Sequence, residues 1–292
     1  MQWGAASRLQ RFWDIRAALN FIGGGTGSSL LIWATVGLLT GYPYFAAALT
    51  GLAFVAGGLF MVWLEIGKPW RAFNLLFRPQ TSWMTREGIV ALFLFSAAAI
   101  AVLFDPILRL PINIPSPVVP AFVTACLGLA FLYCQVRILH SARGLPAWRE
   151  PRAMSLVAMS GLTEGMGIYI VLTTISGSVP VFVAPVALAL VIGRGFIWHA
   201  YVSALARSAA PQPTMSALLG MRRNFRNFGH VLPAVLIALY LVWPGPATPL
   251  LALAGIAATL AGWRFKAVLV TRAAYIPEYS IPAAPIRGQP GC

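Results

Sequence analysis

Residues 44–65 read YFAAALTGLAFVAGGLFMVWLE, a run of apolar and small residues that ends in a carboxylate at Glu65. A helix needs about 20 such residues to cross the hydrocarbon core of a bilayer. A second run of similar length begins at Glu87. Two membrane-spanning helices are therefore expected here, with the segment 65–87 between them at a membrane surface.

The rest of the chain continues this pattern. Of its 292 residues, 59% are hydrophobic and only 10% are charged, whereas ordinary soluble domains carry about 25% charged residues. This composition excludes a soluble protein. We predict an all-α polytopic membrane protein with eight transmembrane helices, at residues 18–40, 44–65, 87–108, 116–139, 153–176, 178–205, 229–244 and 246–264.

The basic residues mark one side of this membrane domain. A net charge of +14 would suggest a nucleic-acid partner for a soluble protein, but here Arg and Lys gather before the first span, in alternate connections and after the last span. The opposite connections 41–44, 177–179 and 244–247 carry no charge, and only Asp105 and Arg109 interrupt this pattern. By the positive-inside rule both termini face the cytoplasm. We expect lipid, and no nucleic acid, around this chain.

Three regions follow from the pattern. Residues 1–17 form an interfacial N-terminal segment, residues 18–274 the eight-helix membrane domain, and residues 275–292 an extended tail containing four prolines. The polar, Arg-bearing start at Gln2–Arg16 does not resemble a cleavable signal peptide. Lys266 is counted among the basic residues that follow the last span.

The segment 65–87 is the strongest candidate for a functional site. It holds four basic residues, two Trp, two Phe and two Pro. Glu87 opens the third span, where the helix dipole favours a carboxylate, and the sharper interpretation is that it relays a proton for a redox ligand. Glu65 stands at a helix C-terminus, where negative charge is disfavoured, which indicates a partner such as Lys68 or Arg71, or a functional role.

Two charged residues lie deep within predicted spans. Glu164 and Arg194 lie in the fifth and sixth spans, at similar distances from the turn that joins them. A lone charge at mid-membrane costs about 2.5–3.5 kcal/mol even on the lenient scale, so we predict that the two form a buried pair, directly or through water. The pair is either a structural ion pair or a step in a proton path.

The sequence gives little support for a bound metal. Cys126 and Cys134 lie inside one span and Cys292 is the last residue, so no iron–sulfur ligand pattern is present. His199 and His230 are the histidines nearest the apolar body, and they do not form the two pairs that a haem protein would show. We expect no haem, iron–sulfur cluster or other metal in this chain.

A glycine-rich run occurs early in the first span. Gly23–Gly27 superficially resembles a phosphate-binding loop, but it follows no strand, lacks the Lys-Ser/Thr ending and continues into an apolar helix. Small residues in such a position favour close helix contact, or leave room for a ligand.

Three blocks of sequence resemble a known family, the membrane anchor subunits of molybdopterin oxidoreductases of the dimethyl-sulfoxide-reductase and NrfD/polysulfide-reductase kind. The eight-span layout covers nearly the whole chain, and the middle block is the most specific. The blocks are WDIRAALNFIGGG at 13–25, GKPWRAFN at 67–74 with SWMTRE at 82–87, and KAVLVTRAAY at 266–275.

The resemblance implies a quinone site. It implies that Glu87 is the quinone-linked acid and that Gly67, Arg71 and Phe73 shape the pocket. One departure concerns proton handling, because a dimethyl-sulfoxide-type anchor has a His where Glu65 stands here.

We therefore predict a quinone-interacting anchor in a bacterial inner membrane. It would pass electrons between ubiquinone or menaquinone and a partner iron–sulfur subunit, which carries a molybdopterin catalytic subunit, both on the cytoplasmic side. In this hypothesis Arg71 orients a quinone oxygen, and Trp70, Phe73 or Trp83 packs on the ring. The alternatives are a secondary transporter that uses Glu164 and Arg194 as its coupling pair, and a purely structural anchor.

Overall fold

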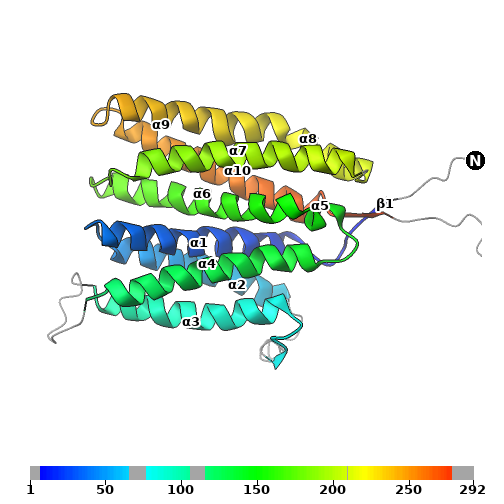
Figure 1. Ribbon diagram of the computed structural model, residues 1–292, viewed down its shortest axis with the longest axis horizontal. Coiled ribbons are helices and arrows are strands. Elements are labelled where there is room, and N and C mark those ends of the chain that lie inside the picture. The colour runs from blue at the N-terminus through cyan, green and yellow to red at the C-terminus, as the bar shows by residue number, and fades with distance from the viewer. Residues whose placement is uncertain (1–6, 66–76, 106–115, 209, 278–292) are drawn as a thin grey trace, which may run out of the picture.

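The computed structural model describes residues 7–65, 77–105, 116–208 and 210–277 (Figure 1). Within them, eight helices are long and apolar enough to cross a membrane, which confirms the predicted fold class. The spans are α1 (Ile15–Leu39), α2 (Phe45–Glu65), α3 (Trp83–Leu103), α4 (Val118–Ser141), α6 (Pro151–Ile175), α7 (Val183–Arg207), a continuous helix made of α8 (Gln212–Arg226), η3 (Asn227–Val231) and α9 (Leu232–Val242), and α10 (Thr248–Thr271).

Two of the predicted spans differ from the helices by more than five residues at one end. The seventh was expected at 229–244, but its helix runs from Gln212 to Val242, because the amphipathic α8 leads into it through one π-helical turn. The eighth was expected to end at 264, but α10 continues to Thr271. This extension places Lys266 inside a membrane-spanning helix, where the side chain is 1% exposed, and not in the tail.

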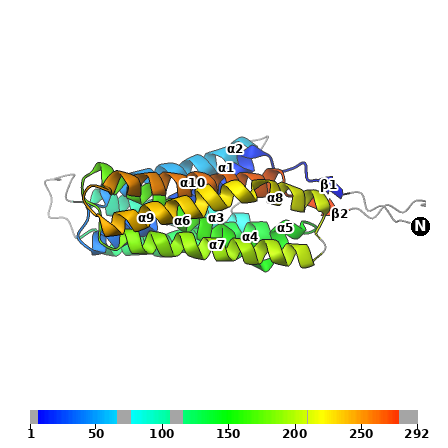
Figure 2. The same ribbon diagram turned by 90° about the horizontal axis from the view of Figure 1, so that it is seen from above.

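Helix α1 lies at the centre of the bundle. All the long helices run roughly along one axis, and α6, α7, α9 and α10 lie on one side of α1, with α2, α3 and α4 on the other (Figures 1 and 2). Helix α1 packs directly on α2, α4, α6 and α10. Its glycines, serines and threonines from Gly23 to Ser29 are all buried, so the centre of this membrane protein is unusually polar.

The glycines of α1 allow this packing because together they face several neighbouring helices. A Cβ atom on Gly23 would lie 2.6 Å from the backbone oxygen of Phe54 in α2, and one on Gly25 would lie 2.5 Å from Nζ of Lys266 in α10. Gly24 faces the side chain of Gln135 in α4. The prediction of close helix contact around Gly23–Gly27 is therefore confirmed.

The two described ends of the chain pair with each other. Strand β1 (Ser7–Leu9) and strand β2 (Tyr275–Pro277) form a short antiparallel ladder in which Arg8 faces Ile276. The ladder lies beyond one end of the bundle, beside α5 (Pro146–Arg149) (Figure 1). We call this end, which carries β1, β2 and α5, the basic end.

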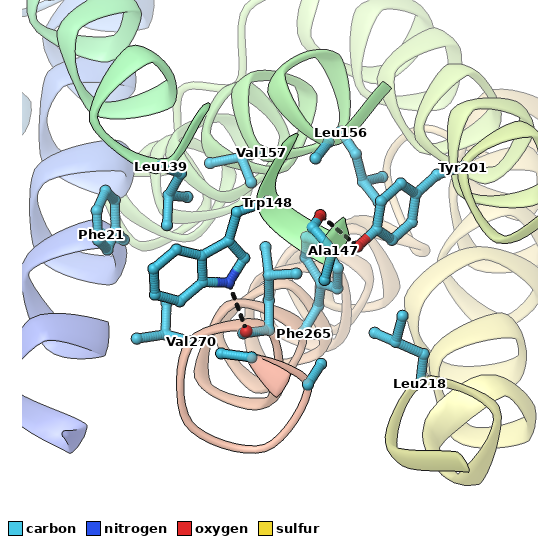
Figure 3. Close-up of a cluster of buried hydrophobic side chains, with 14 of the residues drawn as sticks. Phe21, Leu139, Ala147, Trp148, Leu156, Val157, Tyr201, Leu218, Phe265 and Val270 are labelled. Atoms are coloured by element: carbon cyan, nitrogen blue, oxygen red, sulfur yellow. Dashed lines mark hydrogen bonds between the residues drawn. The ribbon is translucent and has the colours of Figure 1, made fainter. Parts of the chain in front are cut away.

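A buried aromatic cluster closes the bundle at the basic end. Between α4 and α6, the short helix α5 turns inward, and its Trp148 is only 2% exposed. Trp148 Nε1 donates to the carbonyl oxygen of Leu269 at 2.9 Å, and the Tyr201 hydroxyl donates to the carbonyl oxygen of Ala147 at 2.8 Å (Figure 3). These bonds join α5 to α10 and α7.

The contact between α1 and α2 can be tested with two adjacent glycines. A Cβ atom on Gly58 would lie 2.9 Å from the backbone nitrogen of Gly24 and 3.1 Å from the carbonyl oxygen of Asn20, whereas a Cβ atom on Gly57 would meet nothing within 4 Å. Gly58→Ala should lower the free energy of unfolding by about 1–3 kcal/mol, because the helices must move apart. Thermal unfolding of the purified protein in detergent measures this loss.

Gly57→Ala is the matched control and should leave the unfolding temperature unchanged or slightly raised, since alanine is the better helix former. Equal destabilisation by both substitutions would contradict the packing described here.

Candidate functional site

A cavity of about 130 Å³ lies between α1, α2, α3 and α4. Helix α1 contributes three of the eight lining residues, and the neighbouring helices contribute their ends nearest the basic end. The lining residues are Trp13, Ala17, Asn20, Phe21, Val62, Glu65, Met84 and Ile138.

Two aromatic rings form one wall of the cavity. The Trp13 ring stacks on Phe21, with 5.8 Å between ring centroids, and also lies 4.8 Å from the ring of Trp148. Gln10 fixes the position of Trp13: its side-chain amide donates to the Trp13 carbonyl oxygen at 2.6 Å and its Oε1 accepts from the Trp13 backbone nitrogen at 2.8 Å. Trp13 is therefore held at its backbone by Gln10 and at its ring by Phe21 and Trp148.

Glu87 lies behind this cavity. Ser82 caps helix α3 by accepting a hydrogen bond from the Thr85 backbone nitrogen, and Glu87 follows within the first turns, with a side chain only 4% exposed. The side chains of Gln135 and Asn20 approach its carboxyl group. Asn20 in turn lines the cavity, so it connects the buried acid to the open space.

Three oxygen atoms at this position have no hydrogen-bond partner among the described residues. They are Oε1 of Glu87, Oδ1 of Asn20 and Oε1 of Gln135, and all three are buried. A buried polar atom left without a partner costs about 1–3 kcal/mol. Such a group of unpaired acceptors is expected where a ligand or ordered water supplies the missing donors.

The structure brings together some of the residues predicted for the site. Glu65 lines the same cavity as Asn20, and Arg16 donates to the neighbouring carbonyl oxygen of Leu64 at 3.1 Å. Trp83 does not line the cavity: the guanidinium groups of Arg86 and Arg137 lie 4.1 Å and 4.8 Å from its ring centroid.

The other four predicted residues of the site, Gly67, Trp70, Arg71 and Phe73, lie outside the described residues, as does Lys68.

Glu164 has a different ionic partner from the one predicted. Its Oε2 lies 2.7 Å from Nζ of Lys266, and both side chains are buried. The Thr26 hydroxyl donates to the same oxygen at 2.7 Å. We predicted that Glu164 pairs with Arg194 directly or through water. The direct form is wrong, because α10 reaches further along the bundle than expected and places an ammonium group beside the carboxylate; the form through water stays a prediction.

Arg194 instead joins three helices through their backbone. Its guanidinium donates to the carbonyl oxygen of Gly229 at 2.6 Å and to that of Ala258 at 3.0 Å. Its Nε lies 3.3 Å from Nε2 of His230. The π-helical turn Asn227–Val231 explains this arrangement, since the altered hydrogen-bond pattern of a π turn frees backbone carbonyl groups.

His230 is neutral and fully engaged. Because Nε2 accepts from Arg194, the ring proton is on Nδ1, which lies 2.9 Å from the carbonyl oxygen of Phe225 and donates to it. Neither ring nitrogen is free to bind a haem iron. Within the described ranges, no group of three or more His, Cys, Asp or Glu residues is placed to hold a metal ion.

Comparison with protein families agrees with this architecture. The model of the DMSO reductase anchor subunit (DmsC) matches residues 42–263, which is most of the chain. The chain belongs to the DmsC family. No match to a curated protein was found.

Membership of the DmsC family fixes the general role of the chain. It is a multi-pass membrane anchor that associates with a molybdopterin catalytic subunit and an iron–sulfur subunit in a membrane complex. The secondary-transporter alternative used Glu164 and Arg194 as its coupling pair, whereas the direct ionic partner of Glu164 is Lys266.

Some residues of the candidate site were not selected from the sequence. Asn20, Trp13 and Phe21 stand in the first block of the family resemblance, but only their position against α2 and α4 shows that they line a cavity. Gln135 was recognisable as a lone amide in an apolar span. Lys266 was visible as a cation and was misplaced because the length of α10 was underestimated.

The buried charges of this anchor predict unequal effects of two substitutions. Glu164→Gln leaves Lys266 and Arg194 without the carboxylate that acts on both, and should lower the free energy of unfolding by about 3–5 kcal/mol. Lys266→Met should cost clearly less, because Arg194 still balances Glu164. Thermal unfolding of the purified complex compares the two variants.

The double variant Glu164→Gln/Lys266→Met should be as unstable as Glu164→Gln or less so. If Lys266→Met alone proved the most damaging of the three, the charge balance described here would be wrong.

Proposed function

We propose that this anchor binds a quinone headgroup in the cavity lined by Trp13, Asn20 and Glu65, and passes electrons between the quinone pool and its iron–sulfur partner. The observation that carries the proposal is the group of three unpaired buried oxygens beside an aromatic cavity. Family membership supports the proposal, because an anchor of a reductase complex is placed between the membrane and the redox partner.

The size of the cavity suits one ring. Its volume of about 130 Å³ is close to the roughly 150 Å³ of an engineered apolar cavity that holds benzene. The rings of Trp13 and Phe21 offer flat faces, and aromatic pairs favour offset-stacked or edge-to-face contact. An isoprenoid tail would leave between α2 and α3, since α2 packs mainly on α1 and α3 mainly on α4.

The polar groups suit a ligand that gains and loses protons. A bound quinone supplies two-electron, two-proton chemistry. Glu87 accepts or returns a proton at its carboxyl group, while Asn20 and Gln135 orient that group. Glu65 is a carboxylate that lines the cavity itself, in the position where the resembling anchors carry a His.

The arrangement of basic residues gives the side of the membrane. The basic end, which carries the cavity, is expected to face the cytoplasm of a bacterium under the positive-inside rule. We propose that the iron–sulfur and molybdopterin subunits dock at this end, because an electron carrier must approach the quinone ring.

Glu87→Gln tests the proposed role of the acid. The substitution keeps the shape of the side chain but removes the group that exchanges a proton, so quinol-linked turnover should fall by about 10²-fold or more while the complex still assembles. Turnover of the purified complex with a water-soluble quinol, and co-purification of molybdenum and iron, measure the two properties.

The matched control is Glu150→Gln, which alters a carboxylate paired with Arg152 at the basic end and should leave turnover unchanged. Normal turnover in Glu87→Gln would remove the acid from the mechanism. If turnover in this variant were normal and quinone-site inhibitors did not reduce it, a purely structural anchor would be favoured.

A further inference from the structure

We propose that Lys266 is a second proton-handling group of the quinone centre, connected to Glu87 through Gln135 and a water molecule held beside Gly25. This inference rests on the proposed quinone site and extends it from the cavity to the buried ion pair in the middle of the bundle.

Gln135 is the link on the cavity side. Its amide nitrogen donates to the carbonyl oxygen of Asn20 at 3.0 Å, and its side chain approaches the carboxyl group of Glu87. Its Oε1 is buried and has no hydrogen-bond partner in the described part of the chain. The amide therefore presents an unused acceptor toward the interior.

Lys266 lies across a small gap from this acceptor. The Cβ position of Gly25 is 2.5 Å from Nζ of Lys266 and 3.4 Å from Oε1 of Gln135, so these two atoms are at most about 6 Å apart. A water molecule that accepts from one atom and donates to the other, at about 2.8 Å each, spans such a gap. The proposed water requires glycine at position 25, because the Cβ atom of any other residue would occupy the space between Nζ of Lys266 and Oε1 of Gln135.

The ammonium group has a donor to spare. It has three N–H groups, and two of them reach Oε2 of Glu164 at 2.7 Å and the carbonyl oxygen of Phe21 at 2.9 Å. Phe21 itself lines the cavity. The third N–H is available for the water beside Gly25.

The charge balance of the interior makes the proton on Lys266 the mobile one. The charged groups that act on Lys266 within the described residues are Glu164 and Arg194, and His230, which faces Arg194, is neutral. With Lys266 protonated, this cluster carries one excess positive charge; with Lys266 as a neutral amine, Arg194 alone balances Glu164. A net charge in the membrane interior is unfavourable, so the cluster can release this proton without leaving an isolated carboxylate.

With these two groups, all electrons and protons of quinol oxidation have an acceptor. Oxidation of one quinol releases two electrons and two protons. The electrons pass to the iron–sulfur partner, and one proton converts the Glu87 carboxylate to the acid. The other proton passes to the Lys266 amine through the water molecule, which Oε1 of Gln135 holds in place without carrying the proton itself, and converts the amine to the ammonium. Both groups later return their protons to the aqueous phase. Quinone reduction follows the same steps in reverse.

Two substitutions test the link in the complete complex. Lys266→Met removes the second proton group, and Gln135→Leu breaks the connection while leaving the Glu164–Lys266 pair intact. Each should lower kcat for quinol oxidation by about tenfold with KM within twofold, and should raise the solvent deuterium isotope effect on kcat. The double variant should be no slower than the slower single variant, because both interrupt one path.

Arg264→Met is the matched control, since it removes an exposed cation two residues before Lys266 on the same helix and should leave kcat and the isotope effect unchanged. Gln135→Leu also removes a group that orients Glu87, so if Lys266→Met fails to assemble, Gly25→Ala decides in its place: its Cβ atom would occupy the space between Nζ of Lys266 and Oε1 of Gln135, and kcat should fall by about tenfold. Wild-type kcat and isotope effect in Gln135→Leu would overturn the inference. If Glu87→Gln still abolished turnover, the proposed quinone site would be retained without this inference. If Glu87→Gln were fully active, both the quinone site and this inference would be rejected.

Discussion

The close approach of neighbouring helices to the glycine-rich segment of α1 is the constraint on which the rest of this structure depends. Between helices in a membrane there is little hydrophobic driving force, so association relies on packing and on hydrogen bonds between helices. Gly23, Gly24 and Gly25 present bare backbone to α2, α4 and α10 respectively. Side chains such as Gln135 and Lys266 can therefore reach the centre of the bundle.

The same packing explains how charged groups remain in the interior. Two of the buried charged groups have partners from other helices: Oε2 of Glu164 contacts Lys266 and Thr26, and Arg194 donates to carbonyl groups that the π turn and α10 provide. These contacts join α1, α6, α7 and α10 near mid-membrane. A rigid inner bundle results, against which the outer helix α3 presents Glu87.

The candidate site lies where this rigid bundle meets the basic end. Trp13 is fixed by Gln10 and packs on Trp148, which is itself held by Leu269 of α10. The aromatic wall of the cavity is thus built on the same helices that hold the buried ion pair. Proton chemistry at the cavity and charge balance in the interior are connected by this shared framework.

The sequence alone determined the class of protein, the number of spans and the acid at the start of the third span. These follow from the length and polarity of local segments, which the bilayer restricts to apolar helices joined at its surfaces. It also contained the glycine run, whose role in close packing could be stated in advance. Only the tertiary structure decided that Glu164 pairs with Lys266, that Arg194 binds backbone carbonyls, and that Asn20 and Gln135 meet at Glu87. Those contacts join residues far apart in the chain, and they depend on helix lengths, rotations and one π turn that no local pattern specifies.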